Sequence, residues 1–142
     1  MTYTKRYTMR YTMRAEALDA WLKALRSGEY AQTKNKLCHI GENGERSFCC
    51  LGVLSDIAVK EGACGWRGRF RHHEVDGEAN YLTDSVTAWA RLSDQTREQL
   101  PISDLIAFTG KEGESVHLSD LNDRGRSFNE IADIIEQIVE PV

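Results

Sequence analysis

The chain has 142 residues, of which 41% are hydrophobic and 28% are charged. These values are typical of one globular domain with its own core, and no stretch approaches the roughly 18 apolar residues of a membrane-spanning helix. The net charge of −4 argues against a general nucleic-acid binder that uses its whole surface. Four cysteines without an apolar N-terminal leader indicate reduced thiols and a cytosolic location.

Residues 1–14 form a basic arm made of three tandem copies of a Tyr-Thr-x-Arg unit. The arm carries +4 and no acidic residue, which leaves −8 for the rest of the chain; its basic residues are Lys5, Arg6, Arg10 and Arg14. Because so short a segment buries no face alone, we expect either a flexible tail or an extension of the first helix. Arginines that contact phosphates and tyrosines that stack on bases make nucleic-acid binding an alternative function of this arm.

Residues 15–142 are predicted to form a single globular domain. Apolar residues at helical spacing predict an amphipathic helix over about residues 14–27, and Gly28 is placed to end it. Two short apolar runs around Asn43-Gly44 then predict a β-hairpin over about residues 36–50. A two-residue turn there would pair Cys38 with Cys49.

A second helix is predicted from about Cys49 to Glu61. Cys50 falls within its apolar arc and is interpreted as core packing. Cys49 points towards the polar side at the helix N-terminus, where unpaired N–H groups favour a thiolate. It is therefore the nucleophile of an alternative function, a thiol hydrolase or transferase with His117 as the base and Asp123 as the orienting group.

Metal binding is a further hypothesis, since several thiols and imidazoles lie near the hairpin and after the second helix: Cys38, His39, Cys49, Cys50, Cys64, His72 and His73. Structural zinc sites usually have paired ligands two to four residues apart, as in C-x-x-C, and adjacent cysteines on opposite faces do not easily share one ion. We therefore predict no metal and no cofactor.

Residues 62–80 are rich in glycine, arginine and histidine and have no helical pattern. The alternation over residues 66–71 predicts an extended strand with three arginines on one face. Guanidinium groups match phosphate geometry and aromatic rings are interleaved with them, so this segment is the predicted binding site: Trp66, Arg67, Arg69, Phe70, Arg71, His72 and His73. The alternative is a solvated edge strand whose charges discourage aggregation.

Three further helices are predicted: one starting at Thr83-Asp84, a single turn at Leu118–Asp123, and a last helix that a Ser127–Glu130 capping box opens. Residues 99–102 should be extended. Asp123 and Ser127 are placed to satisfy helix amides, which is a structural role. The predicted fold is α+β, a single small domain that is mainly helical, with the hairpin at about 36–50 and room for one further short strand pair.

Two segments, Phe-Cys-Cys-Leu-Gly-Val-Leu at 48–54 and Leu-Asn-Asp-Arg-Gly-Arg-Ser-Phe at 121–128, resemble those of a family of small bacteriophage and prophage proteins. The resemblance covers most of residues 15–140 but not the basic arm or the arginine–histidine segment. It implies a phage accessory protein in the host bacterial cytosol, which binds and inhibits or redirects a host or antiviral-defence factor rather than catalysing a reaction. The implied partner is a defence protein or a small anionic signalling ligand, with nucleic acid as an alternative and no membrane partner.

Overall fold

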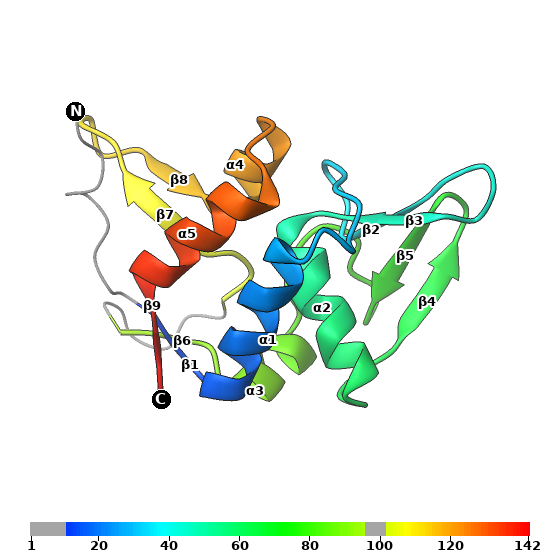
Figure 1. Ribbon diagram of the computed structural model, residues 1–142, viewed down its shortest axis with the longest axis horizontal. Coiled ribbons are helices and arrows are strands. Elements are labelled where there is room, and N and C mark those ends of the chain that lie inside the picture. The colour runs from blue at the N-terminus through cyan, green and yellow to red at the C-terminus, as the bar shows by residue number, and fades with distance from the viewer. Residues whose placement is uncertain (1–10, 96–101) are drawn as a thin grey trace.

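Helices α1 (Ala15–Arg26) and α2 (Cys50–Lys60) pack against each other at the centre of the computed structural model, which describes residues 11–95 and 102–142 (Figure 1). Helix α5 (Phe128–Ile138) covers the other side of α1, while α3 (Asp84–Ala90) and α4 (Leu118–Asp123) contact α2. Buried side chains of all five helices belong to one hydrophobic cluster. Every helix boundary that was predicted from the sequence lies within two residues of the observed one.

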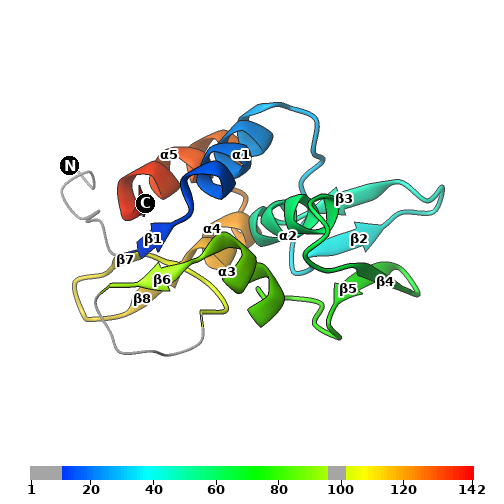
Figure 2. The same ribbon diagram turned by 90° about the horizontal axis from the view of Figure 1, so that it is seen from below.

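Three small sheets surround the helices, and the two larger ones lie at opposite ends of the molecule (Figures 1 and 2). The four-stranded sheet has the order β3-β2-β5-β4 and is antiparallel throughout. The three-stranded sheet has the order β6-β1-β9, and β7 pairs with β8. The strands are β1 (Tyr11–Met13), β2 (Cys38–Ile40), β3 (Arg46–Phe48), β4 (Trp66–Arg69), β5 (His72–Val75), β6 (Ser93–Asp94), β7 (Ile106–Thr109), β8 (Ser115–His117) and β9 (Val139–Pro141).

The prediction of a mainly helical fold is wrong. Of the part of the chain that the structure describes, 37% is helix and 25% is strand, with nine strands in three sheets. The strands have two to four residues each, which is too short for apolar alternation to appear in the sequence. Strands β1, β6 and β9 pair only with segments far away along the chain, so no local pattern in the sequence indicates them.

Strand β1 corrects the prediction for the end of the basic arm. Tyr11 and Met13 are 2% and 0% exposed, because β1 lies between β6 and β9 and pairs in parallel with the C-terminal strand. Residues 11–13 are therefore part of the folded domain and neither a tail nor a helical extension. Residues 1–10 of the arm lie outside the described residues, as do residues 99–101 of the segment 99–102 that we predicted to be extended.

The hairpin of β2 and β3 exists, but its predicted register is wrong by one residue. Cys38 pairs with Phe48 instead of Cys49. The N–H of Gly41 donates to the carbonyl of Glu45 (2.8 Å), so the loop has three residues, with Gly44 in the left-handed region at φ +81°. This longer turn leaves Cys49 outside the strand, where it becomes the N-terminal cap of α2.

Helix α2 is buried on more sides than its sequence indicates. Gly52, Ser55 and Asp56, which the helical projection places on a polar face, are all buried. The chain just before β2 covers this face so closely that a Cβ at Gly52 would lie 1.8 Å from the carbonyl oxygen of Leu37. None of the described helices is long and apolar enough to cross a bilayer.

Candidate functional site

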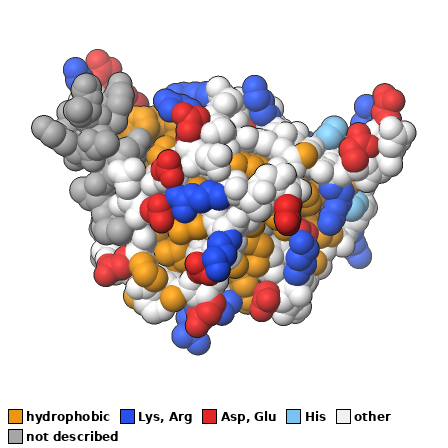
Figure 3. All heavy atoms as spheres, viewed as in Figure 1, with side chains coloured by type: hydrophobic (Ala, Val, Ile, Leu, Met, Phe, Trp, Pro, Cys, Tyr) orange, Lys and Arg blue, Asp and Glu red, His pale blue; other side chains and the backbone are white. Residues whose placement is uncertain are grey.

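The arginine hairpin, defined here as residues 66–75, comprises β4, β5 and the turn between them. It lies at the outer end of the four-stranded sheet, with β4 on the edge. Figure 3 shows basic, histidine and acidic side chains interspersed over this end of the molecule. Arg71, in the turn, adopts a left-handed backbone conformation at φ +70°.

The strand register divides the seven predicted binding residues between two faces and a tip. Arg67 lies opposite Glu74, and Arg69 lies opposite His72, so these four side chains share the outer face of the sheet. Trp66 and His73 point to the inner face, and Phe70 and Arg71 form the tip. The structure therefore brings together three of the seven residues, Arg67, Arg69 and His72, and His39 of β2 joins them opposite His72.

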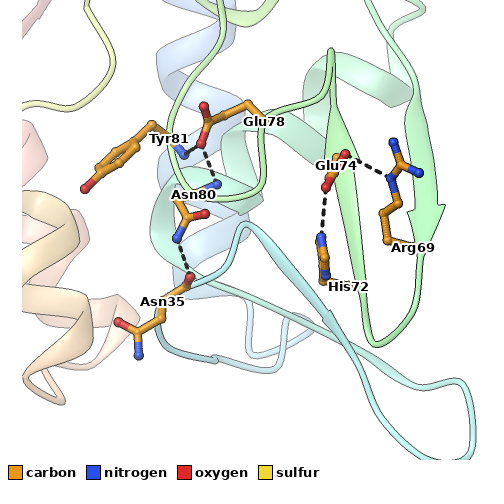
Figure 4. A network of polar contacts seen from close by, with 7 residues as sticks. All are labelled: Asn35, Arg69, His72, Glu74, Glu78, Asn80 and Tyr81. Carbon is orange, nitrogen blue, oxygen red and sulfur yellow. Dashed lines mark hydrogen bonds and ion pairs between the residues drawn. The ribbon is translucent and has the colours of Figure 1, made fainter.

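Glu74 organises the outer face. Its two carboxylate oxygens contact the Nε of Arg69 at 3.3 Å and the Nε2 of His72 at 2.9 Å (Figure 4). The hydrogen bond from His72, followed by that from Arg69, lowers the pKa of the Glu74 carboxyl group. Arg67 has no ion-pair partner among the described residues. The outer face therefore retains positive charge after its internal pairing.

The tip of the hairpin exposes an aromatic ring beside a guanidinium group. The side chain of Phe70 is 83% exposed, and the guanidinium carbon of Arg71 lies 5.0 Å from its ring centroid. A cleft of about 610 Å³ separates the tip from the β2–β3 turn. Its lining residues are His39, Ile40, Gly41, Glu42, Arg69, Phe70 and Arg71.

Trp66 has a structural role on the inner face. Its indole Nε1 donates to the Oδ1 of Asp56 on α2 at 2.9 Å, and its ring packs beside those of Phe48 and His73. The start of β4 is thereby attached to the central helix. Figure 4 shows a second attachment after β5, where Asn80 donates from its side chain to the carbonyl of Asn35 (2.8 Å). Both ends of the hairpin are fixed while its tip projects.

Asp56 is the buried charge at the base of the arginine hairpin, a position that the sequence pattern does not predict. Its side chain is 3% exposed and accepts a 2.6 Å hydrogen bond from the hydroxyl of Tyr30, with the Nζ of Lys60 at 3.3 Å. Desolvation by burial acts to raise its pKa, but the hydrogen bonds from Tyr30 and Trp66 together with the charge and hydrogen bond of Lys60 outweigh that effect, and the pKa is lowered. The only sequence signal is the Asp56–Lys60 spacing of four on a helix.

The thiol of Cys49 does not have the environment that we predicted. Cys49 is 3% exposed, and burial raises the pKa of its thiol to about 12, although its sulfur accepts a hydrogen bond from the N–H of Gly52 at 3.4 Å. Burial also raises the pKa of Cys50. Desolvation therefore outweighs the stabilisation of the thiolate by the N–H groups at the helix N-terminus. The thiolate that the enzymatic hypothesis needs is disfavoured.

The other two residues of the enzymatic hypothesis have different partners. The Nδ1 of His117 lies 3.6 Å from the carboxylate of Asp120, and Asp123 accepts from the backbone N–H of Asn35 at 2.9 Å. Within residues 11–95 and 102–142, no imidazole lies within hydrogen-bond distance of Cys49. The structure does not assemble these three residues into a nucleophile–base–acid arrangement.

The thiols and imidazoles of the metal hypothesis are also separated. Cys38 lies opposite His73 on the inner face of the sheet, whereas His39 and His72 lie on the outer face. Within the described part of the chain, no group of three or more histidine, cysteine, aspartate or glutamate residues is arranged to hold a metal ion.

Comparison with known proteins identifies a family. The model of a domain of unknown function, DUF8296, matches residues 13–139, a range that begins in β1, ends in β9 and includes the arginine hairpin. Comparisons with curated proteins and with solved structures found no match.

Proposed function

The chain belongs to the DUF8296 family, and we propose that it is a binding protein that recognises an acidic partner through the arginine hairpin. In this proposal it acts as a phage accessory protein in the cytosol of the infected bacterium, where it inhibits or redirects a host or antiviral-defence protein. The resemblance of its two cysteine- and asparagine-containing segments to phage proteins motivates the biological setting. The hairpin motivates the mode of action.

The observation that carries the proposal is the exposure of Phe70 next to Arg69 and Arg71. Aromatic and arginine residues dominate binding energy at protein interfaces, and here an exposed aromatic ring and an arginine lie side by side. Burying a phenylalanine ring contributes about 1.5–3 kcal/mol. The hairpin is attached at its base by Trp66 and Asp56, so little ordering free energy is lost on binding.

Affinity capture from infected cells tests the proposal. The wild-type protein should retain a partner that a triple variant, Arg67→Ala with Arg69→Ala and Arg71→Ala, loses. The matched control removes three positive charges at exposed positions outside the hairpin: Lys34→Ala, Lys111→Ala and Arg124→Ala. This control should retain the partner, and both variants should unfold within a few degrees of the wild type because the substituted side chains are on the surface.

Retention of the partner by the hairpin variant would exclude the arginine hairpin as the binding site. Equal loss by both triple variants would mean that the partner responds only to total charge, which also contradicts the proposal. Phe70→Ala gives an independent measurement, since it removes the ring and leaves all charges in place.

A further inference from the structure

We infer that the free edge of β4 binds an extended acidic segment of the partner as a fifth strand of the β3-β2-β5-β4 sheet. The inference rests on the proposed function, because it specifies how the arginine hairpin recognises its partner. Three features carry it: an uncovered strand edge, the direction of the backbone groups along that edge, and the charge beside it.

The two edges of the sheet differ. At the β3 edge, the backbone of Phe48 donates to the carbonyl of Ala31 and accepts from the N–H of Thr33, both at 2.8 Å, so a neighbouring segment covers it. At the β4 edge, no described strand lies beside Trp66–Arg69, and three of its four residues are exposed (Figure 1). The β4–β5 pairing runs over four residue pairs without a bulge. Such a regular, uncovered edge is a template for strand pairing.

The hydrogen-bond alternation tells which backbone groups face outwards. Ile40 donates to the carbonyl of Arg71 at 2.9 Å, so the odd-numbered residues of β5 direct their backbone groups towards β2. His72 and Glu74 must then direct theirs towards β4, where Arg69 and Arg67 lie opposite. The N–H and C=O groups of Trp66 and Gly68 therefore point away from the sheet, which offers a partner strand two donors and two acceptors.

The charges beside this edge favour an acidic partner strand over a second copy of β4. Arg67 and Arg69 project from the outer face next to the outward backbone groups, and Arg67 has no ion-pair partner within the described residues. A second copy of β4 paired edge to edge would bring its own arginines against these, and like charges in neighbouring strands are destabilising. A strand with acidic residues at alternate positions instead forms opposite-charge pairs, each worth about 0.2–1 kcal/mol.

The same register specifies the other positions of the partner strand. Residues that alternate with the acidic ones would lie on the inner side, next to half-buried Trp66 and side-chain-free Gly68. The matching sequence pattern is therefore acidic–apolar–acidic. Backbone hydrogen bonds supply the affinity in this mode of recognition and the alternating side chains supply the specificity.

Synthetic pentapeptides test the inference. The probe is acetyl-Glu-Val-Glu-Val-Glu-amide, titrated to millimolar concentration against the full chain, with amide hydrogen exchange followed by NMR. We expect saturable binding and at least about tenfold slower exchange of the amides of Trp66 and Gly68. The amides of Arg67 and Arg69, already within the ladder, should change little. Acetyl-Lys-Val-Lys-Val-Lys-amide should not bind.

Two N-methylated probes separate strand pairing from simple charge attraction. Methylation of both valine amides removes the donors that would face β4 and should weaken binding at least about tenfold, whereas methylation of two glutamate amides alters the far side of the strand and should weaken it less. The double variant Arg67→Glu with Arg69→Glu should prefer the lysine peptide.

Equal binding of both methylated probes, or binding without protection of Trp66 and Gly68, would overturn the inference while leaving the proposed function intact. The absence of binding at millimolar peptide, or binding only of a polyanion such as oligothymidylate, would overturn it too. The proposed function fails separately, when the arginine hairpin variant still retains the partner in the capture experiment.

Discussion

The side-chain oxygen of Asn122 accepts a hydrogen bond from the backbone N–H of Cys50 at 3.2 Å. This bond joins the two segments that stand out in the sequence, because Asn122 comes from α4 and Cys50 is the first residue of α2. The same oxygen accepts from the side chain of Gln32, and the Asn122 nitrogen donates to the carbonyl of Thr33, both at 2.8 Å. A single buried amide thus connects α2, α4 and the loop before β2.

Replacing Asn122 with alanine should destabilise the fold strongly. Asn122 is 0% exposed, so the substitution leaves the buried Cys50 N–H and the partly buried Thr33 carbonyl without these partners. Unsatisfied buried groups cost about 1–3 kcal/mol each, and we expect a loss of about 2–4 kcal/mol in urea unfolding. Arg124→Ala, on the surface of the following turn, should change stability by less than about 0.5 kcal/mol. A similarly small effect at Asn122 would show that water replaces its bonds.

Gly52 should not tolerate even alanine. The added Cβ would lie 1.8 Å from the carbonyl oxygen of Leu37, and a backbone atom cannot move aside without displacing the strand that follows it. We expect a loss of at least about 3 kcal/mol or a failure to fold. Gly65→Ala is the matched control, since nothing lies within 4 Å of a Cβ there. Thermal unfolding of the two variants checks the expectation, and equal stabilities would contradict the close packing of α2.

The cysteines should differ in their reaction with iodoacetamide at neutral pH. Cys64 is the most accessible of the four, whereas Cys49 is buried and burial raises its thiol pKa to about 12. Peptide mapping after a short reaction of the native protein should therefore find the label on Cys64 first. Cys49 and Cys50 should react only after unfolding. Rapid, selective labelling of Cys49 in the native state would restore the enzymatic hypothesis.

Protonation of Asp56 should contribute to acid unfolding. Its pKa is lower in the folded protein than in the unfolded chain, so the stabilisation is complete above the unfolded value near 4 and is lost as the pH falls through the folded value. Asp56→Asn should cost about 3 kcal/mol at pH 7, because it removes the negative charge beside Lys60 and replaces one of the two acceptor oxygens that Tyr30 and Trp66 use with an NH2 donor. Below pH 4, the free energy of unfolding of the Asp56→Asn variant should depend less on pH than that of the wild type.

Urea titrations from pH 3 to pH 7 measure this difference. Asp19→Asn is a suitable control, since Asp19 is a surface carboxylate that pairs with exposed Lys23 at 3.0 Å, and it should cost no more than about 0.5 kcal/mol. Parallel pH profiles for wild type and Asp56→Asn would show that Asp56 does not contribute to acid sensitivity.

The predicted helices are confirmed, because their signals are local. The Ser127–Glu130 capping box is present in both directions, with the Ser127 oxygen accepting from the Glu130 N–H at 3.1 Å. The single turn at Leu118–Asp123 was predicted with its observed boundaries. A cap and an apolar stripe involve residues within four positions of each other, so the chain reveals them directly.

The sequence predicted which segment forms the candidate site, but it did not predict how the side chains of that segment are arranged. Alternation over residues 66–71 correctly indicated an extended strand with Arg67 and Arg69 on one face. It did not indicate that Trp66 would be attached to Asp56, or that Arg71 would leave the strand for the turn at φ +70°. Both depend on where β5 turns back and on what lies under the sheet.

By itself, the amino-acid sequence determined the five described helices, the existence of the β2–β3 hairpin and the basic character of the segment that follows α2. Only the tertiary structure decided that Cys49 is a buried cap instead of a reactive thiol, that Asp56 is a buried charge, and that Tyr11–Met13 belongs to the core. The reason is physical: helices depend on neighbours three and four residues away, whereas burial and short-strand pairing depend on segments that meet only when the whole chain has folded.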